Sequence, residues 1–155
     1  MDNNDSDNEN LFDSLGVEQT SSKSFHNFIE SSKKNNKIGL FMFYAPWCTH
    51  CVKKGPFLKT LIEKFNNLVK VHTYNSVALA DTDTFCKDIK RYPTLYVVHK
   101  GNKYETRDLL EVMIALVAIS NSMKVRDVID KFRENNYHID DKKKIDISSH
   151  LKLKN

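Results

Sequence analysis

The stretch "FMFYAPWCTHCVKKGP", residues 41–56, places two cysteines two residues apart, directly after an apolar run and a tryptophan. The apolar run "IGLFMFYA" has the length expected of a central strand that is buried on both faces. A helix is expected to begin near Cys48, with Pro56 bending it. Cys48 and Cys51 could form part of a zinc site, a structural disulfide or a redox-active pair.

The remaining histidines and the third cysteine do not favour a zinc site. Such a site needs about four thiolate or imidazole ligands, which are commonly supplied as two closely spaced pairs. The available candidates, His50, His72, Cys86 and His99, lack that spacing. A disulfide that closes so short a loop would remove little entropy from the unfolded chain.

The position of the cysteine pair at the start of a helix favours thiol–disulfide exchange. Free backbone N–H groups and the helix dipole stabilise a thiolate at a helix N-terminus. A second cysteine one turn later is close enough to attack a mixed disulfide formed at the first. The residues alone therefore favour a redox-active pair.

Outside this stretch, the sequence alternates between strand-like and helix-like patterns. An edge strand is expected in "LGVEQTSS", and Ser24 is expected to cap a helix that extends to about Lys34. The later expected elements are a strand in "LVKVHTYNS", a short helix in "DTDTFCKDIK", a hairpin of "TLYVV" and "KYE", and helices in residues 107–120 and 123–135. This order predicts an α/β fold with a central mixed sheet covered by helices on both faces.

Two motifs carry a resemblance to a known family. The segment "FYAPWCTHC" resembles the signature of protein disulfide isomerase-type domains of the thioredoxin superfamily. The segment "RYPT", whose proline lies 42 residues after Cys51, resembles the cis-proline loop of that superfamily. The resemblance covers residues 15–120 and implies a thioredoxin fold, with one extra C-terminal helix in this chain. It also implies that Cys48 is the exposed nucleophile, Cys51 the buried resolving thiol and Pro93 the cis-proline.

The resemblance assigns further roles around the cysteine pair. Trp47 is expected to shape the substrate face, and the backbone of Tyr92 is expected to pair with an extended substrate. The imidazole of His50 is expected to stabilise the Cys48 thiolate and to make the disulfide more oxidising. Arg107 resembles an arginine that swings toward the resolving cysteine.

The sequence departs from the family where a buried acid and a lysine are expected. Met42 occupies the position of the acid that takes the proton of the resolving cysteine, and His72 is expected to replace the lysine on the neighbouring strand. His72 is therefore a candidate base for Cys51, provided that it reaches the same cavity. Cys86 is expected to be an inert core thiol.

Four regions are expected along the chain. Residues 1–14 are expected to form a disordered acidic arm, since they contain few apolar residues. Residues 15–120 form the thioredoxin-like domain, residues 121–138 an added helix, and residues 139–155 a mobile basic tail. The helix around residues 109–119 is apolar on nearly all sides, so it is expected to be covered either by the added helix or by a second copy in a dimer.

Composition limits the partners. The net charge is +4, but 20 of the 24 basic residues are lysines and no arginine cluster is present along the sequence, which disfavours nucleic acid. No apolar segment reaches the ~18 residues of a membrane span. The start lacks a signal-peptide pattern and the end lacks an ER-retention tetrapeptide, which favours a cytoplasmic location.

Together these features predict a thiol–disulfide oxidoreductase that acts on protein thiols and disulfides. Its redox group would be the Cys48–Cys51 disulfide, with no organic cofactor and no metal. An upstream thiol oxidase or reductase is an expected partner. The alternative from another class is a catalytically weak thioredoxin-fold module that binds client proteins.

Overall fold

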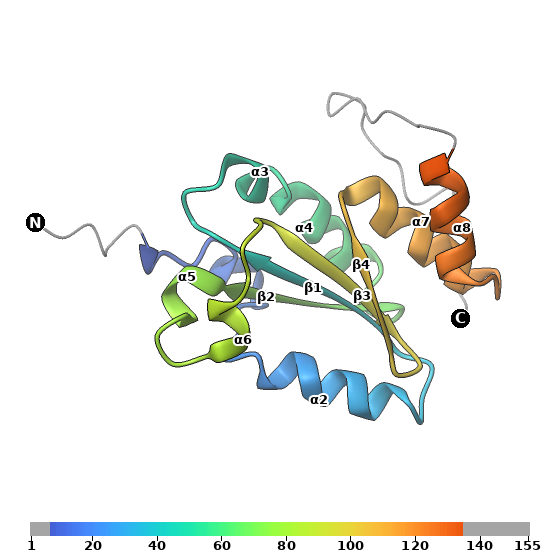
Figure 1. The fold of residues 1–155 in the computed structure, drawn as a ribbon, viewed down its shortest axis with the longest axis horizontal. Coiled ribbons are helices and arrows are strands. Elements are labelled where there is room, and N and C mark those ends of the chain that lie inside the picture. Colours follow the sequence, from blue (N-terminus) through green and yellow to red (C-terminus); the bar gives the residue numbers. More distant parts are fainter. Residues whose placement is uncertain (1–6, 135–155) are drawn as a thin grey trace, which may run out of the picture.

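The computed structural model describes residues 7–134, which fold around a four-stranded sheet in the order β2-β1-β3-β4 (Figure 1). The central strand β1 (Ile38–Tyr44) pairs in parallel with β2 (Val69–Asn75) and antiparallel with β3 (Thr94–His99). β3 continues through a hairpin into β4 (Asn102–Thr106). The expected mixed sheet is confirmed.

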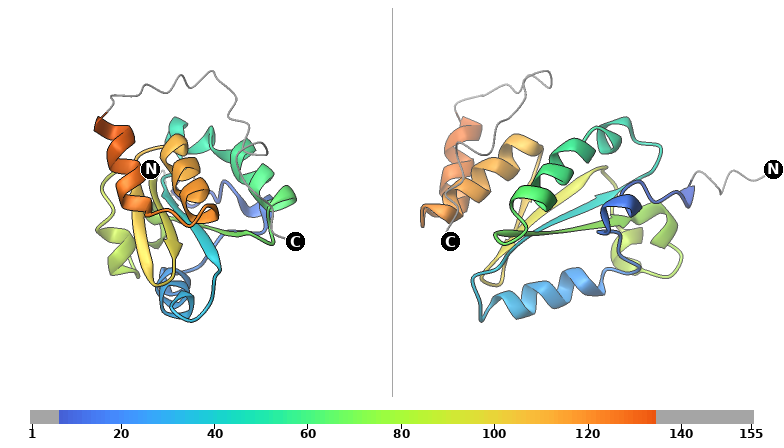
Figure 2. Two further views of the ribbon diagram at one scale, coloured as in Figure 1. Left: turned by 90° about the vertical axis from the view of Figure 1, so that its right-hand side faces the viewer. Right: turned by 180° about the vertical axis from the view of Figure 1, so that it is seen from behind.

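Helices cover both faces of this sheet (Figures 1 and 2). One face carries α2 (Lys23–Ser32), α5 (Ser76–Leu79) and α6 (Thr84–Lys87). The other side carries α3 (Thr49–Val52), α4 (Gly55–Lys64), α7 (Leu109–Ser120) and α8 (Val125–Glu134). The carboxyl end of β1 lies at one end of the molecule, and the cysteine pair follows directly after it.

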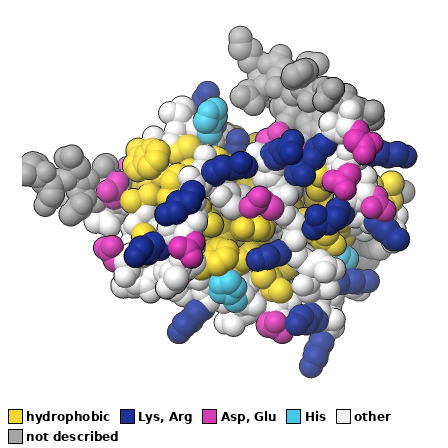
Figure 3. All heavy atoms as spheres, viewed as in Figure 1, with side chains coloured by type: hydrophobic (Ala, Val, Ile, Leu, Met, Phe, Trp, Pro, Cys, Tyr) yellow, Lys and Arg dark blue, Asp and Glu magenta, His cyan; other side chains and the backbone are white. Residues whose placement is uncertain are grey.

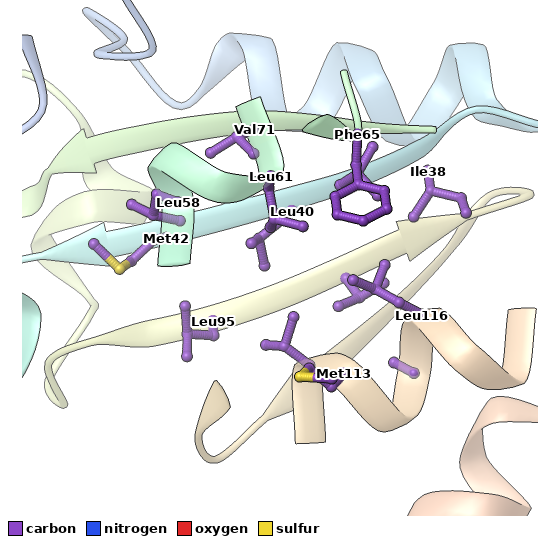
Figure 4. Close-up of a cluster of buried hydrophobic side chains, with 14 of the residues drawn as sticks. Ile38, Leu40, Met42, Leu58, Leu61, Phe65, Val71, Leu95, Met113 and Leu116 are labelled. Carbon is purple, nitrogen blue, oxygen red and sulfur yellow. The ribbon is translucent and has the colours of Figure 1, made fainter. Parts of the chain in front are cut away.

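Strand alternation divides the core into two clusters. Successive side chains of a strand point to opposite faces, so Met42 of β1 lies in a first core cluster under α4 and α7, together with Cys51 (Figure 4). Its neighbours Phe41 and Phe43 point the other way, into a second core cluster under α2. β1 is buried along its whole length, which explains its continuous apolar sequence.

The N-terminal segment is more ordered than its composition indicates. The expectation of a disordered arm over residues 1–14 is wrong for residues 7–14. Phe12 is only 3% exposed, and its ring packs edge-on against Tyr44 at a centroid distance of 5.1 Å. The short 3-10 helix η1 (Asp13–Leu15) follows, and the expected edge strand is reduced to a single parallel bridge between Glu18 and Thr73. Burial of a few apolar side chains offsets the cost of ordering this polar segment.

The helix after the cysteines is broken where a single bent helix was expected. α3 ends at Val52, and α4 begins at Gly55 with Pro56 in its first turn. Proline has no N–H, and the first turn of a helix leaves its N–H groups without intrahelical acceptors, so Pro56 starts a new helix instead of bending an existing one.

The added C-terminal helix covers the apolar helix, which is one of the two covers that were expected. Val125 and Ile129 of α8 are each 5% exposed and belong to the first core cluster with α7. The carboxylate of Glu111, which is fully buried in α7, accepts hydrogen bonds from Arg133 Nε at 2.9 Å and Nη2 at 2.7 Å. Among residues 7–134, no helix combines the length and apolar character needed to cross a bilayer. The expected basic tail, residues 139–155, and the last residues of the expected added helix lie outside the described residues.

Candidate redox site

The two cysteines differ sharply in their exposure. Cys48 is the N-cap residue of α3 and is half-buried, and its Sγ lies 3.6 Å from the carbonyl oxygen of Tyr92. Cys51, one turn later, is completely buried in the first core cluster. Both thiols are free in this structure. Solvent and a substrate disulfide can therefore reach Cys48 but not Cys51.

The environment of Cys51 keeps its thiol protonated. Burial is the largest cause, and the hydrogen bond to Cys48 is the second; together they raise the pKa of Cys51 to about 12. Cys51 therefore cannot begin an exchange reaction, which leaves this step to Cys48.

The expected cis-proline lies directly beside the pair. The Tyr92–Pro93 peptide bond is cis, as predicted from "RYPT". The ring of Trp47, which is 61% exposed, packs edge-on against the Tyr92 ring at 5.6 Å. The structure therefore brings Trp47, Cys48, Tyr92 and Pro93 together on one surface, as the sequence predicted.

A groove of about 630 Å³ runs along this surface. Its lining includes His50, which is exposed, together with Tyr92 and Pro93. Arg107 also lines the groove. The cation whose charge lowers the pKa of Cys51 is Lys54, although this effect is smaller than that of burial. The sequence gives no signal for Lys54, because one lysine among many near a helix turn carries no distinguishing pattern.

His72 was a candidate base for Cys51 provided that it reached the same cavity, and the structure does not meet that condition. Met42 is completely buried on the face that carries Cys51, beside Leu58 (Figure 4). His72 pairs in register with Phe41, and its ring stacks on the Phe41 ring at 4.9 Å on the opposite face of the sheet. Burial lowers the pKa of His72, and its ring packs against Phe41 of the second core cluster. The residue of β2 in register with Met42 is Thr73.

A half-buried carboxyl that the sequence did not reveal, that of Glu18, is hydrogen-bonded to the core cluster that contains Cys51. Glu18 Oε1 accepts hydrogen bonds from the Tyr44 hydroxyl and, at 3.0 Å, from the backbone N–H of Phe12. Tyr44 is completely buried in the same core cluster as Cys51. Burial raises the pKa of Glu18 and outweighs the opposing effect of these hydrogen bonds. The sequence offered no signal for this pairing, because Glu18 and Tyr44 are distant along the chain.

Cys86 lies away from the redox pair. It is 1% exposed in the second core cluster, on the face of the sheet opposite to Cys51, and burial raises its pKa to about 12. This agrees with the expectation of an inert core thiol. Within the part of the chain that the structure describes, no three His, Cys, Asp or Glu side chains are grouped as metal ligands.

Comparisons with known proteins agree with this geometry. Residues 16–117 match the Thioredoxin family. The chain is 42% identical over 66 residues to a protein disulfide-isomerase of Datisca glomerata, an alignment that covers 41% of this chain and 13% of that protein. It is 34% identical over 86 residues to protein disulfide-isomerase A5 of Bos taurus, where 52% of this chain and 16% of the relative are covered. The chain thus spans a small part of the length of these relatives.

A solved structure shows the same fold. The oxidized form of thioredoxin O1 from Arabidopsis thaliana superposes with a TM-score of 0.50 at 23% identity, covering 62% of this chain and 89% of that one. The family match spans more than half of the chain and contains the cysteine pair and the cis-proline loop. The chain belongs to the thioredoxin family.

Proposed function

We propose that the protein is a thiol–disulfide oxidoreductase of the protein disulfide isomerase type, acting on protein thiols and disulfides through Cys48 and Cys51. The observation that carries the proposal is the asymmetry of the pair. Cys48 is accessible beside the cis-proline, whereas Cys51 is completely buried with a raised pKa. The alternative of a catalytically weak client-binding module is not favoured, because it does not require this asymmetry.

The exchange reaction proceeds in two balanced steps. The Cys48 thiolate attacks one sulfur of a substrate disulfide, the substrate S–S bond breaks, and the leaving thiolate takes a proton. Cys51 then loses its proton and attacks Cys48 Sγ, which releases the second substrate thiol. Two electrons pass to the substrate, and the protein keeps the Cys48–Cys51 disulfide. The reverse sequence oxidises a substrate dithiol.

The local structure supports each step. Tyr92 and Pro93 present backbone to an extended substrate beside Cys48, and Trp47 covers the adjacent surface. His50 lies in the first turn of α3, where an imidazolium would favour the Cys48 thiolate. Met42 offers no carboxylate under Cys51, so its deprotonation is favoured only by a backbone hydrogen bond at Ala45 and, to a smaller extent, by the positive charge of Lys54.

The reaction needs no organic cofactor in this proposal, because the thiols of Cys48 and Cys51 themselves supply the two electrons that pass to the substrate disulfide. A thiol oxidase or reductase has to regenerate the pair after each cycle. The cytoplasmic location expected from the sequence stays a prediction.

The proposal is tested by following reduction of insulin disulfides with dithiothreitol as the electron source. The wild-type protein should accelerate the reaction, and Cys48→Ser should abolish the acceleration. Cys86→Ala is the matched control, since Cys86 lies in the other core cluster, and it should keep the activity. If the wild-type protein gave no acceleration, or if Cys48→Ser retained it, the proposed function would be wrong.

A further inference from the structure

The fold gathers all four arginines of the chain around one groove. The sequence spreads them over residues 91–133, and no two of them are close neighbours. In the structure Arg91, Arg107, Arg126 and Arg133 line a single groove of about 460 Å³ between the β3–β4 hairpin and α8. This volume falls within the range of ligand-binding clefts, about 300–1,000 Å³. Figure 3, drawn from the side seen in Figure 1, shows Lys and Arg side chains gathered on this face with acidic side chains between them.

Three of the four guanidinium groups form no ion pair or hydrogen bond among the described residues. Arg133 pairs with the buried Glu111 and so attaches α8 to α7. Among residues 7–134, the side chains of Arg91, Arg107 and Arg126 form no ion pair or hydrogen bond, and all three residues are exposed. Three guanidinium groups therefore line the same groove, and their N–H groups are available to donate hydrogen bonds to a ligand.

The charge of the groove is strongly positive. Lys103 adds a fifth cation to the four arginines, and its Nζ lies 5.6 Å from the centre of the Tyr96 ring, which also lines the groove. Glu105 and Asp130 are the two acids among the lining residues. Five positive and two negative charges line the groove, and the pairing of Arg133 with Glu111 leaves a balance of +2, so the groove attracts anionic groups.

This groove is continuous with the groove beside the redox pair. Arg91, Glu105 and Arg107 line both, and the second groove also contains His50 and Pro93. A chain that extends from Cys48 past the cis-proline therefore meets the arginines next. α8 supplies two of the four arginines and lies beyond residues 16–117, the part that matches the Thioredoxin family. The added helix thus builds a surface that the family match does not include.

We propose that the arginine groove binds an acidic segment, rich in Asp or Glu, of the protein substrate whose cysteine reacts at Cys48. This inference rests on the proposed function, because it assigns a substrate class to the same site. Guanidinium forks match carboxylates with two parallel hydrogen bonds. A nucleic-acid strand fits the groove less well, because it carries a phosphate at every nucleotide, some of which would face Glu105 or Asp130. A peptide can instead place its Asp and Glu residues opposite the arginines alone.

The test compares two disulfide-containing peptides of equal length. In one, the cysteine is flanked by a run of Asp and Glu; in the other, Asn and Gln replace them. The measured quantity is the ratio of kcat/KM for the acidic peptide to kcat/KM for the neutral one. We expect the wild-type protein to prefer the acidic peptide and Arg126→Gln to lower this ratio about tenfold, the loss expected for one strong charge-assisted hydrogen bond.

Lys131→Gln is the matched control, because it removes the same charge from an exposed position of α8 outside the groove. It should leave the ratio within about twofold of the wild type, as expected for long-range electrostatics in salt. An equal preference for both peptides in the wild type would overturn the proposal. An equal loss in Arg126→Gln and Lys131→Gln would also overturn it, because net charge would then explain the preference.

A binding measurement separates this proposal from the proposed function. An acidic peptide without cysteine, titrated against the full chain by fluorescence anisotropy, should bind the wild type and bind Arg126→Gln about tenfold more weakly. This result would support the groove even if neither disulfide peptide were turned over. Tighter binding of a single-stranded oligonucleotide at the same salt concentration, with displacement of the peptide, would overturn the proposal in favour of a nucleic-acid surface.

Discussion

The ion pair between Glu111 and Arg133 predicts a large loss of stability for Arg133→Met. Glu111 is completely buried, and its Oε1 also accepts the backbone N–H of Arg107 at 2.9 Å. Arg133 is the side chain that neutralises this carboxylate from α8, at 2.7 Å. Methionine can cover the same apolar surface but cannot carry the positive charge, so the substitution breaks this ion pair at a buried carboxylate.

Breaking a buried ion pair by removing one partner costs about 3–5 kcal/mol. The Arg133 side chain is 29% exposed, so some screening remains and the lower end, about 3 kcal/mol, applies. For a domain of this size, about 1 kcal/mol corresponds to about 2–4 °C in Tm, so Arg133→Met should unfold about 6–12 °C lower.

Thermal unfolding followed by circular dichroism measures this shift, and two variants serve as controls. Lys33→Met breaks the exposed pair with Glu30, whose N–O distance of 2.9 Å is similar but whose side chains are 54% and 71% exposed, so it should cost less than about 1 kcal/mol. Glu111→Gln combined with Arg133→Met should regain part of the loss, because no buried charge remains. If Arg133→Met cost no more than Lys33→Met, the view that this pair fastens α8 to the domain would be wrong.

Three further predictions concern the site and its surroundings. His50→Pro should lower the reduction potential of the Cys48–Cys51 pair by tens of millivolts in a glutathione titration, where about 30 mV corresponds to 1.4 kcal/mol; an unchanged potential would make His50 a bystander. Burial raises the pKa of Glu18, so this group favours the folded state at low pH, and the contribution is lost as pH rises through the folded pKa. At a pH above that pKa, Glu18→Gln should therefore unfold at a higher denaturant concentration than the wild type. Below the ordinary glutamate pKa, about 4.3, the variant should be no more stable than the wild type. If the difference in unfolding midpoint between the two proteins did not change with pH, this prediction would be wrong. His72→Ala should leave the pH dependence of mixed-disulfide resolution in stopped-flow kinetics unchanged, because its ring lies across the sheet from Cys51, and a lost inflection would refute that placement.

The features predicted correctly from the sequence depend on short stretches of chain. The cysteine pair, its buried strand and the cis-proline loop are each recognisable within a few residues, because the chemistry requires those residue types at that spacing. The mixed sheet follows from strongly apolar strands that alternate with helices. The cover of α7 by α8 follows from one helix that is apolar on nearly all sides and a neighbouring helix with one apolar face.

The predictions that failed required information about register or about distant segments. Whether His72 faces Cys51 depends on the register in which β1 and β2 pair. A shift of one residue in that register would move each side chain of the strand to the opposite face of the sheet. The order of the N-terminal segment depends on Phe12 finding Tyr44, which the local polar composition conceals. The arginine groove forms only when the cis-proline loop, the end of β4 and α8 meet in the fold.

The central claim, that Cys48 attacks and Cys51 resolves, is tested most directly by trapping the mixed disulfide. Cys51→Ala and Cys48→Ala proteins are each incubated with a disulfide-containing substrate protein and analysed by mass spectrometry without reductant. The structure predicts a covalent adduct with Cys51→Ala, attached at Cys48, and none with Cys48→Ala, because Cys51 is completely buried and its raised pKa keeps it protonated. An adduct on Cys51 in the Cys48→Ala protein, or no adduct in the Cys51→Ala protein, would contradict this assignment.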